Sequence, residues 1–174
     1  MGRACEPGAV EAHLVWQEPA RDTGLARLVA GRLTQAGTPP LCVWSGAPLR
    51  LETLDIDHAL PWSAWPCGDL WNLVPASRRV NQHEKRDCLP SAAALARARE
   101  SILAWWHMAW DADPGLAERF WAEAQAALPI GTDATFEAAF AGFEWRRLRV
   151  SQDQPGPEWA GVYPLAQPGQ IDPV

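Results

Sequence analysis

The sequence has no apolar run of the roughly 18 residues that a membrane-spanning helix needs. Residues 1–6 also lack the apolar segment of a secretion signal, so we expect a cytoplasmic protein without a membrane span. The four cysteines are scattered and form no Cys-x-x-Cys pair, which excludes a disulfide framework and argues against a structural zinc site. The net charge of −6 argues against a surface that binds nucleic acid on every side.

The residues that are present indicate an ordinary globular protein. The chain of 174 residues is 48% hydrophobic and 21% charged, which is unlike a disordered chain. This length is sufficient to bury a core without disulfides, and we expect most of the eleven tryptophans to anchor it. The chain is therefore one domain, or one domain with appendages.

Hydrophobic periodicity, turn residues and capping residues predict the secondary structure. The expected elements are a helix at 22–35, a β-hairpin of strands 41–44 and 49–56, a loop at 59–68, a short polar helix at 78–87, helices that start at Ser91 and at Asp113-Pro114, a helix at 133–141 and an irregular tail after 150. The centre is thus a β-hairpin, a long loop and a helix, with helices on both sides, and the predicted class is α+β.

The segment between the hairpin and Ser91 contains the residues suited to chemistry. Asp57 and His58 end the second predicted strand, where consecutive side chains point to opposite faces. Asn81, on the next helix, can bring an amide oxygen to the cation that Asp57 would hold. Oxygen ligands favour Mg²⁺ or Mn²⁺ over zinc. A histidine beside such an ion is what metal-assisted phosphodiester cleavage requires.

The order Asp57-His58, Asn72 and Asn81, followed by a Lys-x-Asp-x-x-Pro-Ser run that ends at Ser91, resembles the HNH endonucleases of the ββα-metal (His-Me finger) superfamily. Asn72 and Asn81 are nine residues apart, as in the variant found in RNA-guided CRISPR effector nucleases. The resemblance covers about residues 41–91. It implies a small ββα-metal core flanked by an N-terminal helix and a helical C-terminal extension.

The resemblance also implies a role for each motif residue. His58 becomes the general base, Asp57 one metal ligand and Asn81 the second, with His83 as the alternative to Asn81. Asn72 braces the loop and helps to orient the base. The implied cofactor is Mg²⁺ or Mn²⁺. Many relatives hold their finger together with zinc on two cysteine pairs that this sequence lacks, so we expect no structural zinc.

Positive charge is concentrated on the predicted finger helix. Arg78, Arg79, Lys85 and Arg86 outnumber the two acidic residues of that stretch, and we expect them to contact the phosphate backbone of nucleic acid. A second cluster at 146–149 is expected on a surface strand, with an extension of the basic groove as the alternative.

These expectations combine into a division of the chain and a function. The divisions are an N-terminal helical segment at 1–40, an HNH nuclease core at 41–91, a helical extension at 92–150 and a Pro-rich tail at 151–174. The expected function is a metal-dependent endonuclease acting on DNA, as the nuclease component of a bacterial defence or restriction-type system with a targeting or regulatory protein partner. The alternative is an inactive nucleic-acid-binding or assembly subunit that keeps the fold.

Overall fold

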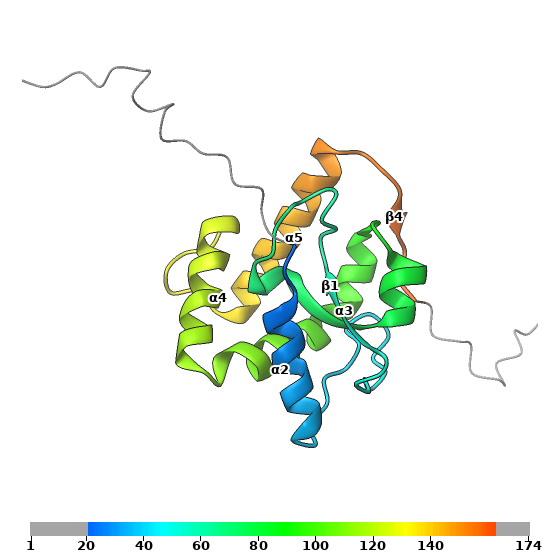
Figure 1. The fold of residues 1–174 in the computed structure, drawn as a ribbon. Coiled ribbons are helices and arrows are strands. Elements are labelled where there is room, and N and C mark those ends of the chain that lie inside the picture. Colours follow the sequence, from blue (N-terminus) through cyan, green and yellow to red (C-terminus); the bar gives the residue numbers. More distant parts are fainter. Residues whose placement is uncertain (1–20, 163–174) are drawn as a thin grey trace, which may run out of the picture.

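The computed structural model describes residues 21–162, in which two small sheets are surrounded by helices (Figure 1). The class is α+β, as the sequence predicts. The elements are α2 (Gly24–Gln35), β1 (Leu54–His58), η1 (Leu70–Asn72), β2 (Leu73–Ser77), η2 (Val80–Lys85), β3 (Leu89–Pro90), α3 (Ala92–Trp106), η3 (His107–Asp111), α4 (Pro114–Ala127), α5 (Phe136–Asp153) and β4 (Glu158–Trp159). No helix within the described range is long and apolar enough to cross a membrane.

The central antiparallel sheet pairs β1 with β2, so the predicted hairpin of 41–44 with 49–56 is wrong. The register places Leu54 opposite Ser77 and His58 opposite Leu73. Residues 41–48 form a turn closed by a single bridge between Leu41 and Pro48. The sequence pattern misled because the true partner strand lies beyond the long loop at 59–72, and turn signals identify only short connections.

The finger, defined here as β1, η1, β2 and η2, ends in a widened helical turn. Residues 80–85 are π-helical, and the amide of Arg86 donates to the carbonyl of Asn81 at 2.9 Å, a bond that spans five residues. The short polar helix predicted at 78–87 is therefore confirmed in place, with a different hydrogen-bond pattern. Such π-turns are frequent at functional sites.

Helix α2 packs against both strands of the central sheet. Ala26 and Ala30 are fully buried at this contact, and small side chains there allow the helix to approach the sheet closely. Arg27 strengthens the contact because it donates to the carbonyl of Leu54 at 3.3 Å and to the carboxylate of Asp55 at 2.6 Å. The first turn of α2 is thereby fixed beside the start of β1.

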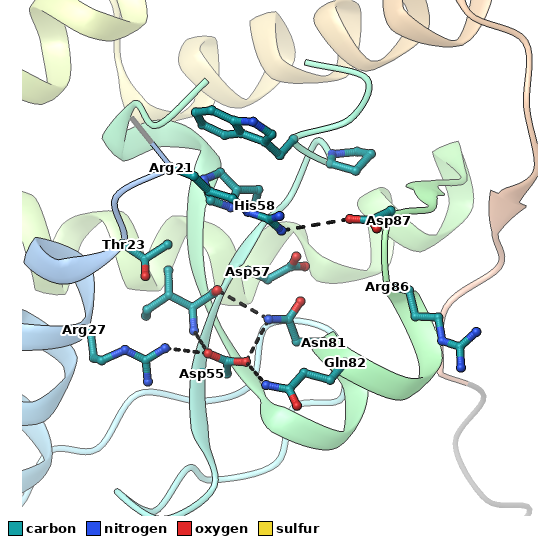
Figure 2. A pocket seen from close by; sticks show the side chains of 13 residues that line it. Arg21, Thr23, Arg27, Asp55, Asp57, His58, Asn81, Gln82, Arg86 and Asp87 are labelled. Atoms are coloured by element: carbon teal, nitrogen blue, oxygen red, sulfur yellow. Dashed lines mark hydrogen bonds and ion pairs between the residues drawn. The ribbon is translucent and has the colours of Figure 1, made fainter. Parts of the chain in front are cut away.

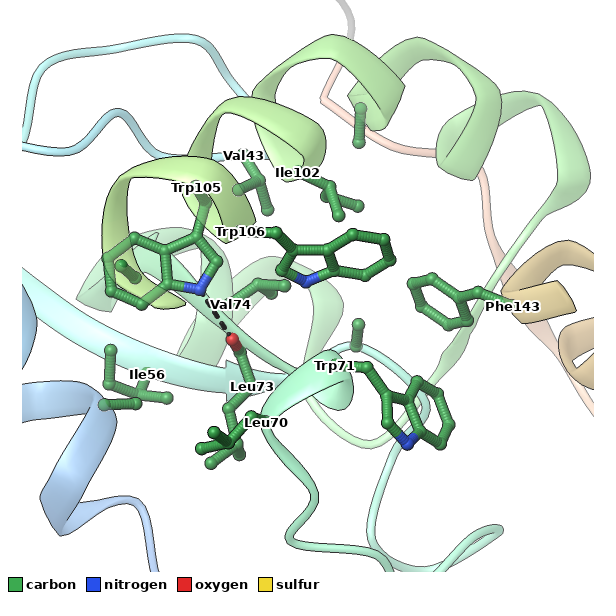
Figure 3. Close-up of a cluster of buried hydrophobic side chains, with 14 of the residues drawn as sticks. Val43, Ile56, Leu70, Trp71, Leu73, Val74, Ile102, Trp105, Trp106 and Phe143 are labelled. Atoms are coloured by element: carbon green, nitrogen blue, oxygen red, sulfur yellow. Dashed lines mark hydrogen bonds between the residues drawn. The ribbon is translucent and has the colours of Figure 1, made fainter. Parts of the chain in front are cut away.

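An aromatic core joins the finger to α3, α4 and α5 (Figure 3). Trp105 of α3 donates its indole N–H to the carbonyl of Leu73 at 2.9 Å, and Trp71 packs edge-on against Phe143 of α5. The predicted helix starts are confirmed, because Ser91 accepts from Ala94 N and Asp113 accepts from the first amides of α4. The finger therefore rests on a helical platform.

Helix α5 is longer than predicted, since it runs from Phe136 to Asp153 rather than ending near 141. The chain then returns to the finger, where β4 pairs in parallel with β3. Arg147 holds this clasp (β3 with β4) together, because it donates to the carbonyl of Pro90 at 2.8 Å and forms an ion pair with Glu158. The part of the Pro-rich tail up to residue 162 thus contributes a strand; residues 163–174 lie outside the described range.

Candidate active site

A polar cavity of 530 Å³ opens at the end of β1, between the finger helix and the first turn of α2 (Figure 2). Both the motif residues and several residues outside the motif contribute to its wall. The lining residues are Arg21, Thr23, Arg27, Asp55, Ile56, Asp57, His58, Pro61, Trp62, Asn81, Gln82, Arg86 and Asp87. Its composition, with three carboxylates, three guanidinium groups and an imidazole, suits a charged ligand.

His58 lines this cavity with a nitrogen that has no hydrogen-bond partner among the described residues. Its Nε2 is buried, the residue is 5% exposed, and the ring packs edge-on against Trp62 at 5.3 Å. Burial lowers the pKa of His58 to about 4, and the positive charges of Arg21 and Lys85 contribute to this shift. The imidazole is therefore neutral at pH 7 and is chemically able to accept a proton.

Asp57 forms a buried ion pair with Lys85. The ammonium lies 3.1 Å from the carboxylate and also donates to the carbonyl of His58 at 3.0 Å, and Trp44 donates its indole N–H to the same carboxylate at 2.8 Å. Burial raises the pKa of Asp57, while the charge of Lys85 and these hydrogen bonds oppose that rise. Three contacts thus fix the orientation of Asp57, which also contributes to the wall of the cavity.

Asp55 lies two residues before Asp57 and on the same face of β1, yet its surroundings differ. It accepts four hydrogen bonds, from Arg27, Asn81, Gln82 and its neighbour Ile56 N. Burial alone would raise the pKa of Asp55, but these hydrogen bonds together lower it. Four donors occupy the acceptor sites of the carboxylate, so Asp55 acts as a brace that fixes Asn81 rather than as an open ligand.

Asn81 donates through its amide nitrogen to Asp55 at 3.0 Å and to the carbonyl of Ile56 at 3.4 Å. The amide oxygen points away from these two acceptors and receives no hydrogen bond from residues 21–162. Asn81 lines the cavity together with Asp57, whereas the exposed His83 does not. The structure therefore brings Asp57, His58 and Asn81 together and leaves His83 outside.

Asn72 lies behind the cavity and is fully buried. Its side chain accepts from the amide of Leu60 at 2.8 Å and donates to the carbonyls of Leu60 and Cys67. These bonds tie the two ends of the loop at 59–72 together directly after His58. Asn72 does not line the cavity, so its contribution is to hold the backbone that carries His58.

The four cations predicted to bind nucleic acid have different surroundings. Lys85 is 0% exposed and paired with Asp57, so its prediction as a nucleic-acid contact is wrong. Arg78 and Arg79 are exposed, and Arg79 pairs with Glu84 on another face of the finger helix. Arg86 is exposed at the edge of the cavity, and its side chain extends away from His58 in Figure 2.

The second basic cluster lies on α5, so the expected surface strand at 146–149 is wrong. Arg146 donates to the carbonyl of Ala127 and stacks on Trp65 at 4.4 Å. Arg147 is buried in the clasp of β3 with β4. Both arginines serve the packing of the helical platform, and neither lines the cavity.

Comparison with protein-family models matches residues 42–91 to the HNH endonuclease family. Residues 42–91 are an HNH endonuclease domain. The match spans β1, η2 and the cavity residues they carry, and this family membership indicates a nuclease that acts on nucleic acid. Searches of curated proteins and of solved structures found no match.

The cavity includes residues that sequence analysis did not single out. Arg27 comes from α2, and Arg21 and Thr23 come from the segment directly before it. All three lie outside the HNH domain, and no motif or spacing connects them with it. Trp62 was expected in the core but is half-buried and contacts His58. The pattern Asp-x-Asp at 55–57 was the one signal that could have indicated Asp55, because alternate residues share a face of a strand.

The donor atoms in the cavity fit a hard divalent cation. Asp57 offers a carboxylate oxygen and Asn81 an amide oxygen, and Mg²⁺ commonly takes one or two such ligands and keeps several waters. The described residues contain no group of three or more His, Cys, Asp or Glu side chains placed to hold a metal ion. Cys42, Cys67 and Cys88 are free thiols, and the expectation that the domain needs no structural zinc stays a prediction.

We expect Lys85→Ala to lower the free energy of unfolding by about 3–5 kcal/mol, because it leaves the buried Asp57 without its counter-charge. Urea denaturation followed by tryptophan fluorescence measures this difference. Arg79→Ala is the matched control, since it removes an exposed ion pair on the same helix and should cost less than about 1 kcal/mol. Equal stability of the two variants would contradict the importance of the buried pair.

Arg86 ends the π-turn with φ +53° and ψ −132°, a backbone conformation that residues other than glycine rarely adopt. We expect Arg86→Gly to raise the free energy of unfolding by about 1 kcal/mol, because glycine adopts positive φ without steric cost. Arg86→Ala keeps the Cβ atom and should give no such gain. Denaturation of both variants decides the matter, and a gain shared by glycine and alanine would refute backbone strain as its cause.

Proposed function

We propose that this protein is a metal-dependent HNH endonuclease that hydrolyses phosphodiester bonds in DNA. In this proposal His58 is the general base, Asp57 and Asn81 hold Mg²⁺ or Mn²⁺, and Asn72 braces the loop behind the base. Arg78, Arg79 and Arg86 remain the candidates for contacts to the phosphate backbone. The proposed setting is a bacterial defence or restriction-type system.

The observation that carries the proposal is the neutral imidazole of His58, whose Nε2 has no hydrogen-bond partner among the described residues, in the wall of a cavity that Asp57 and Asn81 also line. A buried polar atom without a partner costs free energy, so such atoms are rare unless they serve a ligand or a reaction. Neutral imidazole accepts a proton from a water molecule that attacks phosphorus. Trp62 packs edge-on against the ring and restricts its rotation.

The divalent ion, when bound, supplies charge stabilisation for the departing oxyanion. Asp57 is prepared for this role because Trp44 and Lys85 fix its carboxylate. Asn81 is oriented for this role because its amide nitrogen donates to Asp55, so its amide oxygen points away from Asp55. The Lys85 ammonium partly neutralises Asp57, so we expect weak cation binding that strengthens when substrate phosphate is present.

The second candidate is a nucleic-acid-binding subunit without activity, and the Lys85–Asp57 pair is the observation that favours it. A carboxylate without a partner would have little purpose in a scaffold, but Asp57 has a partner inside the protein. Two polar atoms favour the enzyme. Among the described residues, Nε2 of His58 has no hydrogen-bond partner and the amide oxygen of Asn81 accepts no hydrogen bond, and a scaffold requires neither atom in this state.

A partner protein is part of the proposal. The cavity contacts identified here are suited to the phosphate backbone, and backbone contacts do not read base sequence. An endonuclease with little sequence specificity endangers the DNA of its own cell. A targeting or regulatory protein partner would supply the restraint, which is the reason for proposing a defence or restriction-type setting.

Conversion of supercoiled plasmid to nicked or linear forms, with Mg²⁺, Mn²⁺ or EDTA, tests the function. We expect cleavage with the metals and none with EDTA. His58→Ala should reduce the rate by about 10²–10⁴-fold, because it removes the general base. Calorimetry with Mn²⁺ should show unchanged metal binding in His58→Ala and weaker binding in Asp57→Ala. Cleavage by His58→Ala at the wild-type rate would refute the mechanism.

Asn81 and His83 provide a second, paired test. We expect Asn81→Ala to lose Mg²⁺-dependent cleavage and His83→Ala to retain most of it, because Asn81 alone lines the cavity. Substitution of softer ions sharpens the comparison, since a histidine ligand would favour Zn²⁺ or Ni²⁺ over Mg²⁺. The reverse pattern of the two variants, together with a preference for Ni²⁺, would assign the metal to His83 instead.

A further inference from the structure

The cations around the cavity differ in how firmly they are already paired. Arg27 is held by Asp55 at 2.6 Å, and Lys85 is buried against Asp57. Arg21 has a single ion-pair partner among the described residues, Asp87, at 4.0 Å. Both side chains of that pair are largely exposed, at 61% and 71%. A pair this long and exposed contributes little, so the guanidinium of Arg21 is available to a ligand.

The position of Arg21 places this positive charge beside His58, the proposed general base. Arg21 and His58 line the same cavity, and in Figure 2 the Arg21 side chain extends over His58 toward Asp87. His58 is the proposed general base, so the phosphate that is attacked must lie against the wall of the cavity that His58 forms. A phosphate placed there needs donors for its non-bridging oxygens, and a guanidinium can supply two parallel N–H groups to a phosphate.

Arg21 lies three residues before the start of α2, and hydrogen bonds fix the chain directly after it. The amide of Gly24 donates to the Asp22 carboxylate at 2.7 Å, and the amide of Arg27 donates to the carbonyl of Thr23 at 3.0 Å. Arg27 connects the first turn of α2 to the sheet through Asp55 and the carbonyl of Leu54. The segment that carries Arg21 is thus anchored to β1, the strand that ends at His58.

We propose that Arg21 binds the phosphate group of the nucleic-acid backbone that lies at His58, so that the active site is composed of the HNH domain and the segment that leads into α2. The substrate phosphate replaces Asp87 as the partner of Arg21. The residue lies outside 42–91, so this contact is a property of the present chain rather than of the matched domain. The inference rests on the proposed nuclease function and adds a substrate-binding residue to it.

Binding of the full chain to fluorescein-labelled probes tests the proposal. The probes are a DNA duplex, a DNA single strand and an RNA of the same sequence, measured by anisotropy in Ca²⁺ over a series of salt concentrations. Arg21→Ala should weaken binding to the preferred probe by about tenfold and reduce the slope of log K against log salt by about one, because one phosphate contact is lost. Arg21→Lys should keep the slope and recover only part of the affinity.

Arg32→Ala is the matched control, because Arg32 is exposed on the last turn of α2, the helix that follows Arg21, and does not line the cavity. It should bind like wild type. Arg21→Ala binding as tightly as Arg32→Ala, while wild type cleaves DNA, would overturn the role of Arg21 and leave the nuclease proposal intact. Wild type that neither binds nor cleaves any probe would overturn both. Thermal unfolding of the two variants should match, since both side chains are exposed.

Discussion

The buried ion pair between Asp57 and Lys85 is the constraint on which the geometry of the site depends. It joins the end of β1 to the end of η2, and no water can compensate either charge because both side chains are buried. Burying two charges is costly unless each is well hydrogen-bonded, so the surrounding contacts must be maintained. Trp44 satisfies the carboxylate, and the carbonyl of His58 satisfies the ammonium. The same four groups thereby fix the backbone that carries the base.

The two carboxylates of β1 show how context separates identical side chains. Asp55 and Asp57 share a strand face and nearly the same burial, at 7% and 3% exposed. Asp55 accepts four hydrogen bonds, from α2, from the finger helix and from the amide of Ile56, while, among the described residues, Asp57 accepts hydrogen bonds from the side chains of Trp44 and Lys85 alone. Two adjacent carboxylates with different numbers of donors can take different roles, one structural and one toward a cation. Alternation along the strand cannot reveal this difference.

Local sequence signals predicted the local structure well. Ser91 and Asp113 are caps whose side-chain oxygens bind the first amides of their helices, a property of a few consecutive residues. The predicted strand pairing was wrong. The observed pairing of β1 with β2 depends on Asn72, which closes the loop at 59–72 from inside the core. Lys85 was misassigned because its partner lies 28 residues earlier, and a lysine on a short polar helix is usually exposed. Arg21 lines the cavity because α2, the helix that follows it, packs against the central sheet, and this packing is a tertiary contact that local sequence signals do not reveal.

The clasp of β3 with β4 bears on the order in which the protein can mature. Trp159 packs edge-on against Trp44 at 5.5 Å, and Trp44 in turn holds Asp57. Support for the carboxylate thus comes from residues 115 positions apart in the chain, and contacts of such long range form late in folding. A ribosome that is still synthesising α5 carries a nascent chain in which β4 does not yet exist. Asp57 reaches its final support only after β4 has been synthesised, so the site stays incomplete while the finger, α3, α4 and α5 are already made.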